Sequence, residues 1–151
     1  MKTRRVAVRA IIFKNGKLLA QQLKASTGGG RDFWCTPGGG LDIGEALTDG
    51  LHRELIEETG IAPKIGRLLF VQQFSEDGEK EQLEFFYLVE NPEDYEVIDL
   101  TATTHGELEV ERVEFIDPKA ENLLPEFLQT VDIQSYIDMV RPVLVYNELA
   151  N

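Results

Sequence analysis

The first part of the chain predicts two strands joined by a turn. Residues 6–13 are almost entirely apolar and rich in strand-forming side chains, and Asn15-Gly16, a pair that tight hairpin turns favour, precedes a second predicted strand at 17–23. Within 6–13, Arg9 shares a face with apolar residues, where an unpaired charge is costly. We therefore expect Arg9 either to meet a carboxylate or solvent at a sheet edge, or to bind an anion in a cleft.

Two longer apolar runs follow in the middle of the chain. Residues 65–74 and 82–90 predict two strands joined by a hairpin turn at 75–79. Residues 107–116 alternate charged and apolar side chains, which predicts a strand with one solvated face. The alternation slips by one residue after Val110, which indicates a β-bulge.

Apolar residues recur at helical spacing between residues 44 and 59. Leu47, Leu51 and Leu55 lie at i, i+4 and i+8, and Gly60 stands where helices commonly end. Shorter helical segments and a last strand are predicted in the C-terminal third, at 120–131, 133–140 and 142–146. This order of elements predicts an α/β fold in which helices sandwich a mixed β-sheet.

The composition fits a single domain spanning residues 1–151. Hydrophobic residues make up 42% and charged residues 28% of the chain, as is usual for globular proteins, but the net charge is −12. So acidic a chain is not expected to bind nucleic acid polymers or anionic membranes through its overall charge. An anionic substrate would therefore require metal ions or a local group of arginines.

The cysteine content and the apolar segments bear on the compartment. Cys35 is the only cysteine, which excludes an internal disulfide and fits a reducing environment. Residues 1–13 are basic and then apolar, like a signal peptide, but Arg9 interrupts the apolar run and no small-residue cleavage site follows. Because no apolar stretch is long enough to span a membrane, we expect a cytoplasmic protein.

Three glutamates crowd the C-terminal half of the predicted helix. Glu54, Glu57 and Glu58 project from one side of it, where they repel one another and face the unfavourable end of the helix dipole. A solvated acidic face is the ordinary explanation, but Glu58 lies beside the apolar stripe, and the small residues Ala46 and Gly50 leave space on the same side. Hard oxygen ligands for Mg²⁺ would explain why this arrangement is tolerated.

The arginine within the cluster has two candidate partners. Arg53 lies four residues after Asp49 and four before Glu57, so either carboxylate can form an i,i+4 ion pair with it. If the helix is regular from residue 44, Glu45 points away from Glu54. We therefore assign Glu45 a supporting role and not that of a direct metal ligand.

Taken together, these residues resemble the sequence signature of the Nudix hydrolase family. Gly39 is followed after five residues by Glu45 and after seven more by Arg-Glu-Leu-Ile-Glu-Glu-Thr-Gly-Ile at 53–61, which fills every fixed position at the required spacing. The preceding residues 34–38 also resemble the family. A match of this length is highly specific.

The resemblance implies a Nudix-like α/β/α sandwich with a loop–helix–loop motif that holds Mg²⁺ or Mn²⁺. It also implies hydrolysis of a pyrophosphate bond in a nucleoside diphosphate joined to another group. By the same resemblance Glu54, Glu57 and Glu58 bind the metal, the Gly38 carbonyl is a further ligand, and Arg53 orients the glutamates. The resemblance makes a homodimer an expected assembly.

The general base varies within the family, so two sources remain open. It is either the signature glutamate Glu54 or a glutamate from a later loop, and Glu109 is preferred over its neighbours Glu107 and Glu111. The ordinary explanation for these three is the solvated face of a strand. Arg9 and Trp34 are the predicted contacts to the substrate.

The sequence narrows the substrate only by elimination. About sixteen residues past the signature, some subgroups carry a proline (ADP-ribose hydrolases) or a tyrosine (dinucleotide polyphosphate hydrolases), whereas this chain reads Glu-Asp-Gly-Glu at 76–79. A nucleoside triphosphate, oxidised or otherwise noncanonical, is therefore the first expectation. ADP-ribose, nucleotide-sugars and dinucleotide polyphosphates are alternatives, as is a non-catalytic nucleotide sensor. A related prenyl-diphosphate isomerase would use Cys35, but a small buried thiol explains that residue better.

Overall fold

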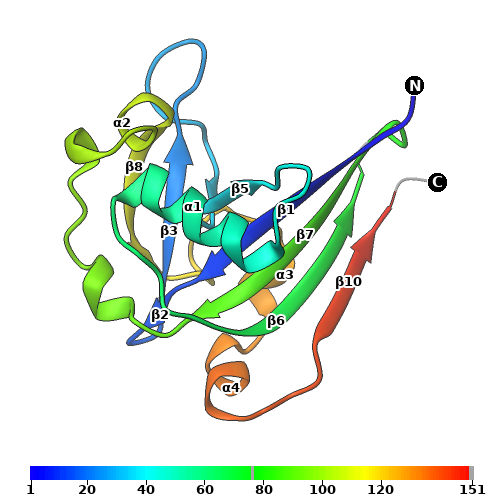
Figure 1. Ribbon diagram of the computed structural model, residues 1–151. Helices are drawn as coiled ribbons and strands as arrows, with labels where there is room; N and C mark the ends of the chain where they lie inside the picture. The colour runs from blue at the N-terminus through cyan, green and yellow to red at the C-terminus, as the bar shows by residue number, and fades with distance from the viewer. Residues whose placement is uncertain (76, 150–151) are drawn as a thin grey trace.

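The computed structural model describes residues 1–75 and 77–149 and contains two β-sheets (Figure 1). The first has the order β10 (Leu144–Glu148), β6 (Ile65–Phe74), β7 (Lys80–Val89), β1 (Thr3–Ile11) and β5 (Gly38–Gly40). The second has the order β2 (Phe13–Lys14), β3 (Lys17–Leu23), β4 (Trp34–Cys35) and β9 (Leu123–Leu124), with β8 (Val110–Ile116) on the other side of β3. The chain passes from one sheet to the other at Ile12, between β1 and β2.

The predicted mixed sheet is confirmed, but the strands divide into two sheets where one was expected. In the first sheet β1 pairs parallel with β7 and antiparallel with β5, and β6 pairs antiparallel with β7 and parallel with β10. The helical elements are α1 (Leu47–Thr59), α2 (Gly106–Glu109), α3 (Phe127–Thr130), α4 (Ile133–Asp138) and the 3₁₀ turns η1 (Pro92–Tyr95) and η2 (Leu100–Ala102).

Helices cover opposite faces of the strands, which gives the sandwich. Leu51 and Leu55 of α1 pack with Val8 and Ala10 of β1 in one core cluster. A second cluster joins Ile11 of β1 to residues of β6, β7, α3 and α4. Because successive residues of a strand face opposite ways, β1 contributes to both layers. In Figure 1, α1 accordingly lies in front of the strands and α3 behind them.

The long helix begins later than its apolar spacing predicts. Gly44 has a φ of 86°, a left-handed conformation that glycine favours, and the N–H of Glu45 donates to the Asp42 carbonyl. This turn delays the helix to Leu47, whereas Gly60 ends it as predicted, with a φ of 75°. Glu45 therefore lies outside the helix.

Three other predicted segments, at 107–116, 120–131 and 75–79, compare with the structure as follows. Residues 107–109 belong to α2, so the strand predicted from residue 107 begins only at Val110. The predicted bulge is confirmed by a shift of register in the pairing of β3 and β8. The single helical region predicted at 120–131 is wrong, because Leu123 pairs with Trp34 in a short strand before α3 begins. Glu76, in the predicted turn at 75–79, lies outside the described residues.

None of the helices among the described residues combines the length and apolar character that crossing a membrane requires.

A buried tyrosine ties the segment after α1 to η1. Tyr95 is 1% exposed, and its hydroxyl donates to the Ile61 carbonyl at 3.0 Å. A Tyr95→Phe substitution should lower the free energy of unfolding by about 1 kcal/mol, because the carbonyl loses its partner. Urea denaturation measures this, and Tyr146→Phe, at a residue that is 38% exposed, is the control. Equal stability of both variants and the wild type would contradict the assigned hydrogen bond.

Candidate functional site

The C-terminal half of α1 forms one wall of a cleft of about 660 Å³. Leu51 and Leu55 are fully buried against the strands, which fixes the rotation of the helix and turns its glutamates toward β5. The cleft is lined by residues of β1, β3, β5, α1 and α2 and of the loop after β3, namely Arg5, Arg9, Gln21, Leu23, Lys24, Arg31, Gly38, Gly39, Gly40, Arg53, Glu54, Glu57, Glu58, His105, Leu108 and Glu109. Segments far apart in sequence therefore meet there.

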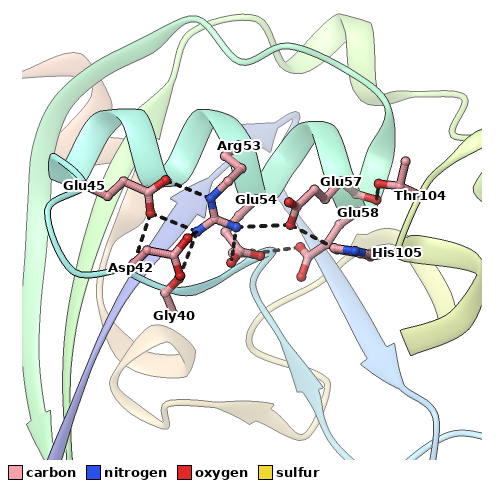
Figure 2. Close-up of polar contacts among 10 residues, drawn as sticks. Gly40, Asp42, Glu45, Arg53, Glu54, Glu57, Glu58, Thr104 and His105 are labelled. Carbon is pink, nitrogen blue, oxygen red and sulfur yellow. Dashed lines mark hydrogen bonds and ion pairs between the residues drawn. The ribbon is translucent and has the colours of Figure 1, made fainter.

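Arg53 connects the carboxylates of this wall (Figure 2). Its Nε and Nη2 donate to both oxygens of Glu45 at 2.8 and 2.9 Å, and its Nη1 donates to Glu54 and Glu57, each at 3.1 Å. Nη2 also donates to the Gly40 carbonyl. The hydrogen bonds from Arg53 lower the pKa of Glu45 to about 2. Arg53 thus holds two glutamates of α1 in fixed orientations.

Two sequence-based expectations about Arg53 meet different outcomes. The i,i+4 ion pair with Glu57 is confirmed. In place of the alternative pair with Asp49, Arg53 forms a bidentate pair with Glu45, which reaches it because the chain turns before the helix begins. The supporting role predicted for Glu45 fits these contacts, whereas its predicted orientation away from the cluster was wrong.

Glu58 is the most buried of the three glutamates, at 4% exposure. Burial raises its pKa to about 8, although the N–H of Gly38, which donates to its Oε2 at 3.0 Å, and the positive charge of Arg9 oppose that shift. Gly38 has a φ of 141°, and an added Cβ would lie 2.0 Å from the Val8 carbonyl oxygen. Only glycine fits where β5 lies so close to β1, and this position lets the Gly38 N–H reach Glu58.

Glu54 lies directly over the glycine strand. Burial raises its pKa, and the hydrogen bond from Arg53 opposes the rise. A Cβ at Gly39 would lie 2.5 to 2.7 Å from the carboxylate atoms of Glu54. The missing side chain at Gly39 therefore provides the space that the Glu54 carboxylate occupies.

The space beside Gly50 has a different use from the one expected. A Cβ there would lie 2.5 Å from Leu41 and 3.0 Å from Glu45, both in the loop before the helix. Gly50 therefore accommodates the protein's own loop, and the expectation of room for an outside group at this position was wrong.

His105 was not predicted as a site residue. Its Nδ1 lies 3.0 Å from Oε2 of Glu57, and its backbone N–H donates to the Glu57 carbonyl at 2.9 Å. The only sequence signal was the scarcity of histidine, since the chain has two. Nothing local in the sequence places residue 105 beside residue 57.

The cleft also contains a group of cations. Arg5, Arg9, Lys24, Arg31 and Arg53 line it, which is five of the chain's 15 lysine and arginine residues, against four carboxylates. Of these five residues, only Arg9 and Arg53 were predicted from the sequence to belong to the site. The other three lie in the basic N-terminal segment and in a glycine-rich loop, where charge alone does not indicate a site.

The carboxylate partner expected for Arg9 is confirmed, and the side chain also lines the cleft. Its Nε donates to Glu84 at 2.9 Å and its Nη1 to the Thr36 carbonyl at 3.2 Å, which supplies the carboxylate partner. The same side chain lines the cleft, where its charge also acts on Glu58. The Glu84 charge and hydrogen bond keep the pKa of Arg9 raised against its burial.

Of the three glutamates considered as an alternative general base, one lines the cleft and two do not. Glu109 lines the cleft at the end of α2, whereas Glu107 and Glu111 are not among its lining residues. Trp34 is 5% exposed, packs in a core cluster with Leu123, and is not among the residues that line the cleft. The guanidinium of Arg112 lies over its ring, 5.2 Å from the centroid.

The donor set of the cleft fits a hard divalent cation. Glu54, Glu57 and Glu58 each keep one carboxylate oxygen without a hydrogen-bond partner among the described residues. Within residues 1–75 and 77–149, no three acidic, histidine or cysteine side chains already converge on one point closely enough to hold an ion. Small rotations of these carboxylates would be needed, and oxygen-only ligands suit Mg²⁺ or Mn²⁺.

A methyl group at Gly39 tests the placement of Glu54. A Gly39→Ala substitution should displace the Glu54 carboxylate and lower the rate of the pyrophosphate hydrolysis that the resemblance implies about 10-fold or more, as when a supporting contact of a metal ligand is lost. Steady-state kinetics measure the rate and circular dichroism checks the fold. The control is Gly30→Ala, whose methyl would meet the flexible Gln22 and Glu111 side chains at 3.2 and 3.3 Å. Unchanged activity of Gly39→Ala would contradict a role for Glu54 in this position.

Comparison with known sequences bears on this cleft. The sequence model described as the NUDIX domain matches residues 3–133. An ADP-ribose pyrophosphatase from Methanocaldococcus jannaschii is 38% identical to the chain over 66 residues. That similarity covers 44% of this chain and 38% of the relative, so it spans less than half of either protein.

Solved structures share the fold along most of the chain. The ORF135 protein of E. coli is 22% identical with a TM-score of 0.68, and the similarity covers 93% of this chain and 95% of that one. The MutT protein from Methanosarcina mazei Go1 is 25% identical with a TM-score of 0.64, covering 84% and 89%. The sandwich that positions α1 over the glycine strand is therefore common to these proteins.

Proposed function

The chain belongs to the Nudix family, and from that membership we propose that it hydrolyses the pyrophosphate bond of a nucleoside triphosphate with the aid of Mg²⁺ or Mn²⁺. The observation that carries the proposal is the composition of the cleft. The cleft is lined by four carboxylates, three of them on α1, and by five cations, in a chain whose net charge is −12. A polyanion held through metal ions is the substrate class that needs both kinds of group.

Each residue of the cleft has a proposed part in the reaction. Glu54, Glu57 and Glu58 would hold the metal together with the Gly38 carbonyl, and Arg53 would keep the glutamates in place. A divalent cation bound there would offset the charge on the pyrophosphate oxygens as the bond to phosphorus breaks. Arg9 would contact a phosphate of the substrate.

The attacking water needs a carboxylate to accept its proton. Glu54 and Glu109 both line the cleft, so both stay candidates for the general base. Burial raises the pKa of Glu54, which makes it a stronger base than an exposed glutamate. Glu109 is exposed at the end of a short helix and has more freedom to move toward the water.

The cations of the cleft support a substrate with a further phosphate beyond the scissile bond. Arg5, Lys24 and Arg31 are exposed and line the cleft. A third phosphate group would give these side chains an anion to bind. This favours a triphosphate over a nucleoside diphosphate joined to a neutral sugar.

ADP-ribose is a second candidate. The similarity to an ADP-ribose pyrophosphatase favours it, since 38% identity over 66 residues is the highest identity among the proteins compared above. That segment covers only part of both chains, so we rank this substrate after the triphosphates.

Incubation of the full chain with Mg²⁺ and a panel of nucleotides tests the proposal. The panel comprises ordinary and oxidised nucleoside triphosphates, ADP-ribose, nucleotide-sugars and dinucleotide polyphosphates, with products separated by ion-exchange chromatography. We expect a nucleoside monophosphate and pyrophosphate from a triphosphate, and no products in the presence of EDTA. Preferential cleavage of ADP-ribose would support the second candidate, and no turnover of any compound would refute hydrolysis.

A further inference from the structure

We propose that His105 is a positioning residue that fixes the carboxylate of Glu57 in the orientation required for metal binding. The inference rests on the proposed function, because it treats Glu57 as a ligand of the catalytic metal. His105 lies outside the signature at 39–61. It approaches Glu57 near the C-terminal end of α1, whereas Glu45 lies near the N-terminal end (Figure 2).

The contact engages one oxygen of Glu57 only. Oε2 accepts hydrogen bonds from His105 Nδ1 at 3.0 Å and from Arg53 Nη1 at 3.1 Å. A carboxylate only accepts hydrogen bonds, so Nδ1 of His105 must carry the hydrogen. Oε1 has no hydrogen-bond partner among the described residues and is the oxygen available to a cation. Two donors on one oxygen thus determine where the other oxygen points.

The backbone shows that this contact is built into the fold. The His105 N–H donates to the Glu57 carbonyl at 2.9 Å, so the two residues are joined by main chain and side chain alike. At Gly106 an added Cβ would lie 2.1 Å from the Glu58 carbonyl oxygen. Because residue 106 has no side chain, the segment can approach α1 closely enough for His105 to reach Glu57.

Two hydrogen bonds of the Thr103 hydroxyl stabilise the segment that brings His105 to α1. The Thr103 hydroxyl donates to the Leu100 carbonyl at 2.6 Å and accepts from the Glu107 N–H at 3.1 Å. His105 is therefore held in a supported turn, although its side chain is 47% exposed at the mouth of the cleft. Groups that orient a metal ligand through a second hydrogen bond commonly change metal affinity 10- to 100-fold when removed.

Binding of Mn²⁺ to the full chain, followed by electron paramagnetic resonance, tests the inference without relying on activity. His105→Ala should weaken Mn²⁺ binding about 10-fold or more. His105→Asn, whose amide can donate from nearly the same place as Nδ1, should restore most of the affinity. His52→Ala is the matched control, because His52 is the other histidine and lies exposed on α1. Thermal denaturation checks that each variant is folded.

The outcomes separate this inference from the proposed function. Wild-type affinity in His105→Ala would overturn the inference, as would equal losses in His105→Ala and His105→Asn, because the hydrogen bond would then not be the property that matters. If His105→Ala does not fold, His105→Leu replaces it, since leucine keeps volume but donates nothing. A wild-type chain that binds Mn²⁺ but cleaves no nucleotide would refute the hydrolase proposal alone. A wild-type chain that binds no Mn²⁺ would refute both.

Discussion

A Glu57→Gln substitution is expected to lower kcat/KM for the best nucleotide substrate by at least about 100-fold while the protein stays folded. The amide has the shape of the carboxylate but lacks its charge, so it is a poor ligand for a hard divalent cation. Its oxygen can still accept from Arg53 and His105, which contact one oxygen of Glu57 at 3.1 and 3.0 Å. The loss should therefore be specific to activity.

Steady-state kinetics with Mg²⁺, together with urea denaturation, measure the effect of Glu57→Gln. The control is Glu126→Gln, because Glu126 is exposed beside α3, away from the residues of the cleft. The free energy of unfolding of both variants should lie within about 0.5 kcal/mol of the wild-type value. Full activity of Glu57→Gln would show that the metal is bound elsewhere.

A Gly38→Ala substitution is expected to destabilise the protein by about 2–5 kcal/mol and to abolish most of its activity. The φ of 141° at this residue is accessible to few side chains, and the new Cβ would lie 2.0 Å from the Val8 carbonyl oxygen and 2.9 Å from Arg9 Cα. Backbone atoms cannot move aside as a side chain can, so β5 would separate from β1. The N–H that Gly38 donates to Glu58 would move with it.

Urea denaturation of Gly38→Ala measures this cost, and Gly28→Ala separates its two causes. Gly28 has a φ of 94°, but a Cβ there would meet nothing within 4 Å. That control should therefore lose only about 1 kcal/mol, from backbone strain. Equal losses in the two variants would mean that the close approach of β5 to β1 contributes nothing to stability.

The part of the site that the sequence predicted is the part whose geometry is local. The glutamates of α1 and Arg53 lie within six consecutive residues, so the helical repeat alone brings them to one side, and Leu51 and Leu55 determine which side is buried. The strands at 17–23 and 65–74 were likewise predicted with their observed bounds, because each is a largely apolar run next to turn-forming residues.

What the sequence did not reveal depends on tertiary packing. His105 meets Glu57 across 48 positions of sequence, and Glu45 meets Arg53 only because Gly44 turns the chain before the helix begins. The burial of Trp34 likewise depends on a distant segment, since Trp34 pairs and packs with Leu123, 89 positions later. A sequence motif does not reveal contacts between residues that lie so far apart along the chain.

The contrast between the cationic cleft and the acidic chain has a consequence for how a nucleotide arrives. Beyond the Debye length of about 8 Å at physiological ionic strength, an approaching polyanion meets the field of the whole molecule, whose net charge is −12. Only within that distance do Arg5, Lys24 and Arg31 dominate. Dissolved salt weakens the distant repulsion that slows encounter, and it also weakens the close attraction that retains the bound molecule. Added salt should therefore speed both the arrival of a nucleotide at this protein and its release.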